Sequence, residues 1–493
     1  MRLQFADDAA LIAHDCKSAQ ALVDIAAAWC NWANMLIRID KCVVFGMAKI
    51  KGVHKQIDPK IYINSTSIPP VSSGGSFKYL GKIFTYQMEN NEIKDTLVNK
   101  VKNILQITSG LKIPAQQKLK IIRQYLPSQM SFDLRIYNLS YTWITNNLDS
   151  MITNNIRSWL NYPVNSCVAQ ISHLPFSKGG LNIPSLRSIA EKHALSVRAS
   201  LKNNPDSSMR SLWSATSLKN IPIDSLLENN NLKSANKQLK NSFLSSDLNH
   251  LFNLQLQGVI IQSVTAQLNK SEIARWGHCI LSLPEASFKF ARRAFINQLA
   301  SASNLVRWGR GLSNLCILCN AIQTNKYILS NCSSLSALAR YTVRHDSLLS
   351  IIVDYLNTAI KDATLYSDLK GAKSVSHCFK SLRPDIVIVS ASAKRVVSTE
   401  LTVCHETNFE SARLRKMNRY ANLKCNLCDL YSCYNLIKFT IEISVLGFVS
   451  NTNDIMKTLN INKFPKSVLN NLTRVAIEHS RLIFSNRNQT DDQ

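Results

Sequence analysis

Residues 5–12 read Phe5-Ala6-Asp7-Asp8-Ala9-Ala10-Leu11-Ile12 and place two adjacent acids between short apolar runs. This pattern predicts two short strands with Asp7 and Asp8 at the bend between them. Adjacent carboxylates at a hairpin tip can hold Mg²⁺, which prefers oxygen ligands. A two-metal nucleotidyl-transfer site needs a further carboxylate from another strand, and we expect none from upstream because only four residues precede Phe5. The turn therefore predicts half of a phosphoryl-transfer site, with a solvated Asp-Asp turn as the alternative.

The segments that follow this turn predict a helix and then two strand segments. Residues 18–36 predict an amphipathic helix, and we expect its tryptophans to pack in the core. Residues 37–45 predict a strand around a polar turn, and Phe77-Lys78-Tyr79-Leu80-Gly81 predicts a further strand. The apolar stripe of the helix comprises Leu22, Ile25, Ala26, Trp29 and Trp32.

This order of elements resembles the second half of a reverse-transcriptase palm: a (Y/F)-A-D-D turn, a helix, a lysine-bearing strand and a Y-L-G segment. The resemblance implies that Asp7 and Asp8 are catalytic acids that bind Mg²⁺. It also implies that Tyr79, Leu80 and Gly81 contact nucleic acid as a primer grip. The fingers and the first palm aspartate of that family have no counterpart in the sequence, so we predict no polymerase activity from this chain alone.

Composition favours a large protein that binds a polyanion. The 493 residues suggest about three domains, and their net charge is +26. Such an excess of Lys and Arg points to nucleic acid, although a basic but otherwise ordinary protein is the alternative. No uninterrupted apolar run reaches the roughly 18 residues of a membrane span. The 13 cysteines are too sparse for a disulfide scaffold, and we expect a nuclear protein, or a cytoplasmic one in a ribonucleoprotein.

The middle of the chain is helical and basic. Helices are predicted over residues 92–109, 115–126 and 143–160. Pro127 should end the second helix, and Lys118 and Arg123 on it are candidate contacts to a nucleic-acid backbone, as in the thumb that follows a polymerase palm. Gly179-Gly180-Leu181-Asn182-Ile183-Pro184 resembles the G-G-L-G-I-P-S segment after the thumb of non-LTR retrotransposon polymerases.

The next 100 residues carry fewer signals. Residues 202–250 are rich in Asn, Ser and Lys, which predicts a loose connector with short helices. Helix should resume over about residues 260–305.

Cys316-x2-Cys319-x7-Tyr327-x4-Cys332 has the spacing of a C-x2-C-x7-H-x4-C zinc knuckle, with tyrosine at the histidine position. Structural Zn²⁺ requires four ligands, and a neutral phenol is a poor one, so the zinc site is incomplete. Three possibilities are open: His345 or another residue completes it, water does, or the site is dead. A second group, Cys425-x2-Cys428-x4-Cys433, has no evident fourth ligand, and reduced core cysteines are the alternative for both groups.

The C-terminal region predicts a strand–turn–strand–helix unit. Arg340 to Asp346 should open a helix over Ser347–Ile360. Arg383-Pro384-Asp385 leads into a strand at residues 386–389, and residues 395–403 return as a second strand that holds Glu400-Leu401-Thr402. Further elements are a helix capped by Asn408 that runs to about Leu423 and carries Lys416 and Tyr420 on one face, and a strand over Leu436–Val449.

The predicted unit brings together the groups of a metal-dependent nuclease. Asp385 and Glu400 on paired strands can share one Mg²⁺, which polarises a phosphate and activates water. A nearby Lys would stabilise the developing charge. This is the logic of PD-(D/E)xK nucleases, except that Thr402 occupies the usual Lys position, so Lys416 must reach in from the helix. The alternative is a Pro-Asp turn, a surface Glu and a solvated helix.

Taken in order, these motifs resemble the C-terminal half of a non-LTR retrotransposon polyprotein with a restriction-like endonuclease, truncated at its N terminus. The resemblance implies an α+β multidomain fold and target-primed reverse transcription, with element RNA and target DNA as partners and Mg²⁺ and Zn²⁺ as cofactors. It assigns catalysis to Asp385, Glu400, Lys416 and Tyr420, and nucleic-acid contacts to the Arg344-His345 pair. The expected domains are a partial palm (1–90), a thumb (91–200), a helical linker (201–310), a Cys knuckle (311–335) and the endonuclease (336–493).

Two functional classes stay open at this stage. One is an enzyme, a Mg²⁺-dependent DNA endonuclease beside a broken polymerase. The other is a basic nucleic-acid-binding protein whose sites are dead.

Overall fold

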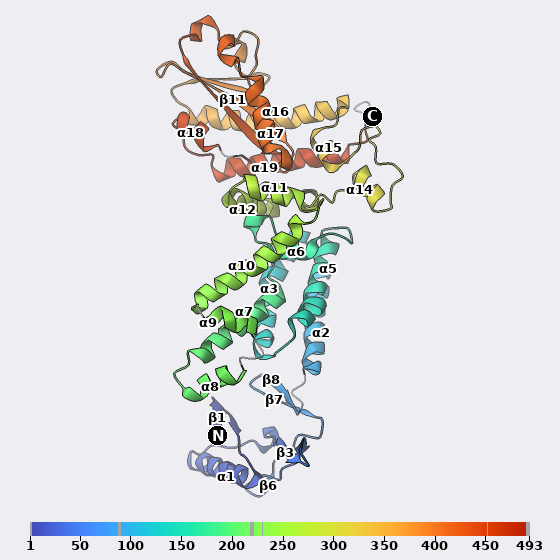
Figure 1. The fold of residues 1–493 in the computed structure, drawn as a ribbon, viewed down its shortest axis with the longest axis vertical. Helices are drawn as coiled ribbons and strands as arrows, with labels where there is room; N and C mark the ends of the chain where they lie inside the picture. Colours follow the sequence, from blue (N-terminus) through green and yellow to red (C-terminus); the bar gives the residue numbers. More distant parts are fainter. Residues whose placement is uncertain (1, 87–89, 217–220, 229, 451, 490–493) are drawn as a thin grey trace.

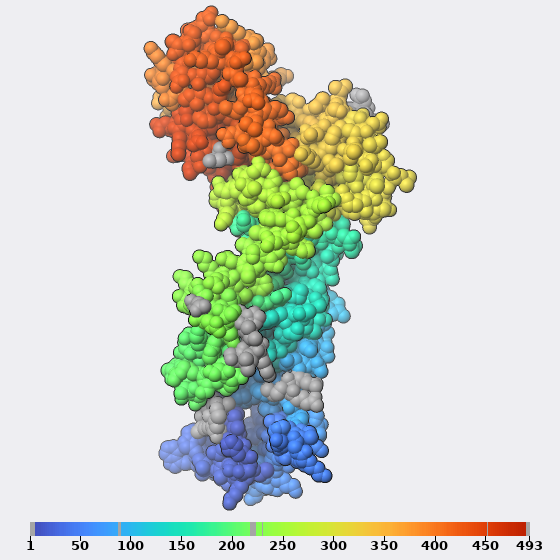
Figure 2. Space-filling model, viewed as in Figure 1, coloured from blue at the N-terminus to red at the C-terminus, as the bar shows by residue number. Residues whose placement is uncertain are grey.

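The computed structural model describes residues 2–86, 90–216, 221–228, 230–450 and 452–489. Small hairpins and one helix lie at one end of an elongated molecule, helices fill the middle, and a four-stranded sheet lies at the other end (Figure 1). Figure 2 shows the same progression along the surface, from the N-terminal to the C-terminal region. The predicted α+β class is confirmed at this coarse level. None of the helices in the described ranges is both long and apolar enough to cross a bilayer.

The N-terminal hairpin is formed as predicted. Strands β1 (Arg2–Phe5) and β2 (Asp8–Leu11) are antiparallel, with Phe5 opposite Asp8. Ala6 takes a left-handed conformation (φ 52°) in the two-residue turn. Helix α1 (Cys16–Trp32) follows, and the side chain of its N-cap, Asp15, accepts a hydrogen bond from the Ser18 N–H at 2.8 Å.

The prediction that the tryptophans of α1 are buried is wrong. Trp29 is 46% exposed, Trp32 83% and Ile25 68%. The small core of this region instead gathers Ala27 with three isoleucines, Ile61, Ile63 and Ile68. An apolar stripe shows which face of a helix favours burial, but in this one only Leu22 and Ala26 are half-buried, and the larger side chains stay exposed.

The rest of the N-terminal region consists of separate two-stranded hairpins. They pair β3 (Gly46–Ile50) with β4 (Val53–Ile57), β5 (Tyr62–Ile63) with β6 (Thr66–Ser67), and β7 (Ser76–Tyr79) with β8 (Lys82–Thr85). The strand predicted at 77–81 is confirmed, except that Leu80 and Gly81 form its turn with φ of 46° and 81°. The strand predicted at 37–45 is wrong, because a short 3-10 helix, η1 (Ile39–Lys41), occupies its centre.

The three helices predicted for the basic middle region are present. They are α2 (Asn91–Gly110), α3 (Ala115–Ile136) and a continuous run of α4 (Tyr141–Trp143), η2 (Ile144–Asp149) and α5 (Ser150–Trp159). Pro127 does not end the second helix but lies inside α3. An internal proline costs a helix about 3 kcal/mol. Burial of Leu126, Met130 and Leu134 on both sides of it offsets that cost.

Further helices continue to the C-terminal region. They are α6 (Val168–His173), η3 (Phe176–Lys178), α7 (Leu186–Lys202), α8 (Ser207–Thr216), α9 (Ile221–Glu228), α10 (Leu232–Phe252), α11 (Val259–Gln267), α12 (Lys270–Cys279), η5 (Ile280–Ser282), α13 (Glu285–Phe295) and α14 (Ala302–Arg307). The connector predicted over 202–250 is more regular than expected. Its helix α10 spans 21 residues because Asn231 caps it and Ala235 and Leu239 pack on α7 and α9.

The C-terminal sheet has the strand order β12-β11-β10-β9. Its strands are β9 (Thr364–Ser367), β10 (Ile386–Ser390), β11 (Arg395–Cys404) and β12 (Asn435–Ser444). The first three are antiparallel neighbours, whereas β11 and β12 are parallel. Strand β12 ends earlier than predicted, because the chain turns back at Gly447 (φ 80°) and the Ser444 N–H donates to the Phe448 carbonyl.

Helices cover both faces of this sheet (Figure 1). Those around the sheet are α16 (Leu335–Ala359), η6 (Val375–His377), η7 (Glu406–Asn408), α17 (Phe409–Arg419), η8 (Leu423–Asn426), η9 (Asp429–Tyr431), α18 (Asn453–Thr458) and α19 (Lys466–Ser485). The short helix α15 (Asn325–Ser330) precedes them and contacts α19. Helices α16 and α19 pack on the face that carries Leu401, and Tyr420 packs on the opposite face. Helix α17 connects the parallel strands, and it ends at Arg419 rather than near Leu423.

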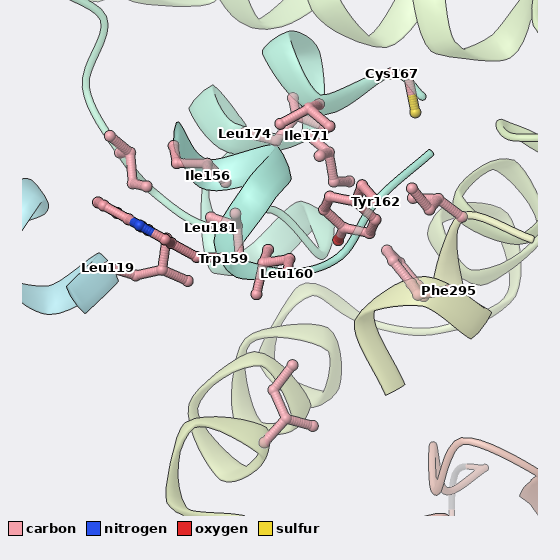
Figure 3. Close-up of a cluster of buried hydrophobic side chains, with 14 of the residues drawn as sticks. Leu119, Ile156, Trp159, Leu160, Tyr162, Cys167, Ile171, Leu174, Leu181 and Phe295 are labelled. Carbon is pink, nitrogen blue, oxygen red and sulfur yellow. The ribbon is translucent and has the colours of Figure 1, made fainter. Parts of the chain in front are cut away.

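One hydrophobic core extends from the middle helices into the C-terminal sheet region. Figure 3 shows part of it, where Tyr162 lies near Ile171 and Phe295, and the ring of Trp159 points the other way, toward Leu119. Trp276 of α12 is fully buried, stacks on Phe448 with ring centres 4.5 Å apart, and donates its Nε1–H to the Leu446 carbonyl at 2.7 Å. These contacts fix the helical region to the segment that follows β12.

Candidate nuclease centre and cysteine cluster

Asp385 and Glu400 meet at the start of β10, as predicted. In the β10–β11 pairing Ile386 lies opposite Thr399, so Glu400 lies across from Asp385. The Asp385 backbone N–H donates to Glu400 Oε1 at 3.3 Å. Asp385 Oδ2 in turn accepts the Leu401 N–H at 2.7 Å. Both carboxylates are therefore held at one end of a buried hairpin.

Lys416 reaches this pair from α17, as predicted from the absence of a Lys at position 402. Its Nζ lies 2.8 Å from Glu400 Oε2 and 3.8 Å from Asp385 Oδ2. Thr402 is buried on β11. Because α17 is the connection between the parallel strands β11 and β12, it passes over the sheet and carries the ammonium group to the acids.

Tyr420 completes this side of the centre. It is buried, and its hydroxyl donates to the Arg383 carbonyl at 3.1 Å, so it ties α17 to the segment that leads into Asp385. Burial and the negative charges of Glu400 and Asp385 raise the pKa of Tyr420 far above its usual value. Its hydroxyl is therefore a permanent hydrogen-bond donor at neutral pH.

His345 belongs to this centre, a role that the sequence did not predict. Its Nε2 lies 3.6 Å from Asp385 Oδ2, and its Nδ1 lies 3.0 Å from Asp346 Oδ1. Burial alone would lower the pKa of His345, but contact with Asp385 and Asp346 raises it to about 9. The prediction missed this contact because it began the helix at Ser347. Helix α16 begins at Leu335, after the N-cap Ser334, and presents His345 from its interior.

Arg344 is placed differently from its neighbour. It is only 2% exposed, and its Nη1 donates to Ser480 Oγ at 3.0 Å. This position does not support the predicted contact with nucleic acid.

The two acids of the centre have opposite electrostatic environments. Burial, together with the charge of Asp385, raises the pKa of Glu400 to about 7. Burial would also raise the pKa of Asp385. The hydrogen bond and charge of His345 and the charge of Lys416 have the larger, opposite effect, so the pKa of Asp385 is lowered. Asp385 is therefore the acid that stays ionised, and Lys416 supports the charge of Glu400. Two converging carboxylates of this kind fit Mg²⁺, a hard cation that binds oxygen.

The N-terminal acids lack such an environment. Asp7 and Asp8 are both exposed on the β1–β2 hairpin. In the described part of the chain, no third His, Cys, Asp or Glu joins them in a metal-sized group. They form at most half of a metal site in this chain.

The predicted nucleic-acid contacts of the middle region make bonds within the protein. Lys118 Nζ donates to the Ser109 carbonyl at 2.8 Å. Arg123 is half-buried, donates to the Leu181 carbonyl at 2.9 Å and stacks on Phe176. Both side chains therefore help to hold the helices together.

The Tyr79-Leu80-Gly81 turn lies against α3. A Cβ added at Gly81 would approach the Phe132 ring to 2.9 Å, and the Tyr137 hydroxyl accepts the Ile83 N–H at 2.8 Å. Glycine is required at this position because of both its positive φ and this close approach.

Three of the predicted cysteine ligands converge. The Sγ atoms of Cys316, Cys319 and Cys332 all lie within 4.8 Å of one another. The Tyr327 hydroxyl lies 2.9 Å from Cys319 Sγ. Burial would raise the pKa of the Cys319 thiol, but hydrogen bonds to its sulfur lower this pKa to about 6. The bond with Tyr327 has the largest lowering effect. His345 lies at the carboxylate centre, so it does not complete this cluster.

The second cysteine group does not assemble. Among the described residues, Cys425, Cys428 and Cys433 form no metal-sized group. Cys425 and Cys433 are exposed, as expected for cysteines on a surface segment.

Comparison with known proteins finds two curated relatives of this chain. The chain is 24% identical over 433 residues to the "Retrovirus-related Pol polyprotein from type-2 retrotransposable element R2DM" of Drosophila melanogaster, a match that covers 84% of this chain and 38% of that protein. A "Retrovirus-related Pol polyprotein from type-1 retrotransposable element R2" of Popillia japonica is 23% identical over 186 residues, 37% of each. No family model matches the chain.

These matches define the relationship and its extent. The chain is homologous to the Pol polyproteins of R2 non-LTR retrotransposons, which confirms the predicted resemblance to polyproteins of this class. It spans less than two-fifths of the length of these curated relatives.

Proposed function

We propose that residues 336–493 carry a Mg²⁺-dependent DNA-nicking centre in a retrotransposon-derived polymerase and endonuclease relative. The observation that supports this most is the convergence of Asp385, Glu400 and Lys416 at the end of one hairpin. Homology to retrotransposon Pol polyproteins supports the same class of protein. The proposal assigns Asp385 and Glu400 as the Mg²⁺ ligands.

Each side chain of the centre has a defined task in this proposal. When bound, Mg²⁺ supplies polarisation of a scissile phosphate and activation of water. Lys416 holds Glu400 in place and offers positive charge where negative charge develops on the phosphate. His345 orients Asp385 through its Nε2, and Tyr420 fixes the segment before Asp385 through the Arg383 carbonyl.

The rest of the chain serves to bind nucleic acid in this proposal. We assign residues 1–90 to a partial palm, 91–200 to a thumb, 201–310 to a linker and 311–335 to a knuckle. DNA and RNA are the proposed partners, and the nucleus is the proposed location. Asp7, Asp8 and the Tyr79–Gly81 turn are the parts of a polymerase site in this scheme, but they give no polymerase activity without a further carboxylate.

A second candidate is a nucleic-acid-binding protein that does not cut. The net charge of +26 favours it, because backbone binding needs only a basic surface. Such binding weakens steeply as salt concentration rises, whether or not the chain also nicks DNA.

Plasmid nicking separates the two candidates. The complete chain is incubated with supercoiled plasmid and Mg²⁺ beside Asp385→Ala, with Asp429→Ala as a matched control in the same region. The Asp429 side chain is 95% exposed and pairs with Lys380 on the surface. We expect open-circle product from the unchanged chain and from Asp429→Ala, and none from Asp385→Ala. Equal nicking by all three, or binding without any nicking, would exclude the enzyme.

Primer extension tests the polymerase proposal independently. The chain is supplied with an RNA template, a DNA primer, nucleotides and Mg²⁺. We expect no incorporation above the background of Asp7→Asn. Incorporation that depends on Asp7 would show that the N-terminal acids form a complete site.

A further inference from the structure

We propose that Tyr327 is a metal ligand, and that it completes a site of three thiolates and one phenolate for a zinc-like divalent ion with Cys316, Cys319 and Cys332. This proposal is independent of the nuclease proposal, because it concerns a different cluster. It replaces the interpretation from the sequence that the zinc site lacks a fourth ligand because tyrosine stands at the histidine position.

The distances within the cluster fit tetrahedral coordination. A tetrahedron with metal–sulfur bonds of about 2.3 Å places its sulfur atoms about 3.8 Å apart. Cys319 Sγ and Cys332 Sγ are 3.7 Å apart, and all three sulfurs lie within 4.8 Å of one another. An oxygen ligand would lie about 3.5 Å from each sulfur. The Tyr327 hydroxyl lies 2.9 Å from Cys319 Sγ, so on metal binding it would move about 0.6 Å away from this sulfur.

The backbone around the cluster already holds the four side chains in place. Asn320 has a left-handed conformation (φ 58°), which folds residues 316–321 into a tight turn. Two hydrogen bonds close this turn: the Asn320 N–H donates to the Cys316 carbonyl, and the Cys316 N–H donates to the Ala321 carbonyl. Binding then requires little reorganisation of this part of the chain.

Tyr341 connects the remaining two ligand segments. Its hydroxyl donates to the Ile328 carbonyl at 2.7 Å and accepts the Cys332 N–H at 3.1 Å. Thr324 caps the short helix α15 by accepting the Tyr327 N–H at 3.1 Å. Tyr327 and Cys332 are therefore fixed relative to each other by a residue that is not itself a ligand.

Other candidates for the fourth position are less well placed. His345 is held between Asp385 and Asp346, and no other His, Asp or Glu in the described ranges belongs to the cluster. A water ligand would compete with a phenol oxygen that already touches the sulfur of Cys319. Binding of a divalent ion by this set would release the protons of the three thiols and of the phenol to solvent, and the four anionic ligands would then carry the same charge as a zinc site made of four cysteines.

The test uses the complete, reduced and metal-free chain titrated with Co²⁺ and then with Zn²⁺. The unchanged chain is compared with Tyr327→Phe, Tyr327→His and the control Tyr62→Phe, which alters an exposed tyrosine of the N-terminal region. Two readouts are recorded, the visible absorption of tetrahedral Co²⁺ and the ultraviolet difference band of a metal-bound tyrosinate.

We expect one equivalent of tetrahedral Co²⁺ with a tyrosinate band in the unchanged chain and in Tyr62→Phe. Tyr327→Phe should lose the band and bind more weakly by at least the roughly 10- to 100-fold that loss of an outer-shell partner costs a metal site. Tyr327→His should bind at least as tightly as the unchanged chain but show no band, which also shows that the cluster still folds. Metal binding without a tyrosinate band, unchanged affinity in Tyr327→Phe, or no binding by the unchanged chain would each overturn the proposal.

Discussion

Two pairs of acids lie on antiparallel hairpins near opposite ends of this chain, and only one pair has the surroundings of a reaction centre. Asp7 and Asp8 are neighbours in sequence, exposed at a turn. Asp385 and Glu400 are separated by 14 residues, yet strand register brings them together in a buried setting with Lys416 and His345. Proximity in sequence therefore says less about a metal site than strand pairing, burial and a nearby cation.

The same contrast extends to packing. Trp276 is fully buried in a core that runs from the middle helices to the C-terminal region, whereas Trp32 of α1 is 83% exposed. The C-terminal centre is thus supported by a large core, and the N-terminal acids are supported by a small one.

The largest effect is expected for Lys416→Met. Loss of one group that stabilises transition-state charge typically lowers the rate by about 100- to 1,000-fold, and we expect that loss in plasmid nicking. Breaking a buried ion pair also costs about 3–5 kcal/mol of unfolding free energy, measurable by urea denaturation. The control Lys380→Met removes an exposed pair with Asp429 and should cost less than about 1 kcal/mol. Similar losses in the two variants would contradict the buried-pair account.

Trp276→Ala should reduce stability nearly as much. Removal of a buried tryptophan costs about 3–5 kcal/mol, and this one also loses its hydrogen bond to the Leu446 carbonyl. Trp32→Ala, its counterpart on α1, should change the unfolding free energy by less than about 0.5 kcal/mol. Calorimetric scans of both variants measure the difference. A large cost for Trp32→Ala would show that its face is covered in solution.

His345→Gln should have a moderate effect. If His345 positions Asp385, its loss weakens Mg²⁺ binding about 10- to 100-fold, so nicking requires more Mg²⁺ but largely recovers at saturation. His54→Gln, an exposed histidine on β4, is the matched control. A reduced rate that no Mg²⁺ concentration restores would mean that His345 does more than orient Asp385.

Asp8→Asn should have the smallest effect. An exposed acid at a turn contributes within about 0.5 kcal/mol to stability, and nicking should be unchanged because Asp8 lies in the other region. Urea denaturation and the plasmid assay check both expectations. A change in nicking would show that the N-terminal hairpin takes part in cutting.

Local patterns were sufficient for the geometry of Asp385, Glu400 and Lys416. The hairpin and the helix that follows it are consecutive in the sequence. Their arrangement therefore follows from the strand and helix signals in one stretch of about 35 residues. The N-terminal hairpin and the convergence of the three cysteines were predictable for the same reason.

Contacts between distant elements were not predictable in this way. The contact of His345 with Asp385 depends on how α16 crosses the sheet, although Ser334 as an N-cap could have shown that this helix begins early. Pro127 remains inside α3 because of burial on both sides. The exposure of Trp32 depends on what covers α1, which its own periodicity cannot reveal.

The central claim is that Asp385 and Glu400 hold one divalent ion together. Diffraction from crystals of the chain soaked in Mn²⁺, with anomalous data collected near the manganese edge, tests it most directly. We predict one anomalous peak within about 2.0–2.4 Å of a carboxylate oxygen of both residues, and none at that site in Asp385→Ala. An empty site in the unchanged chain, or a peak bound by neither acid, would contradict the account.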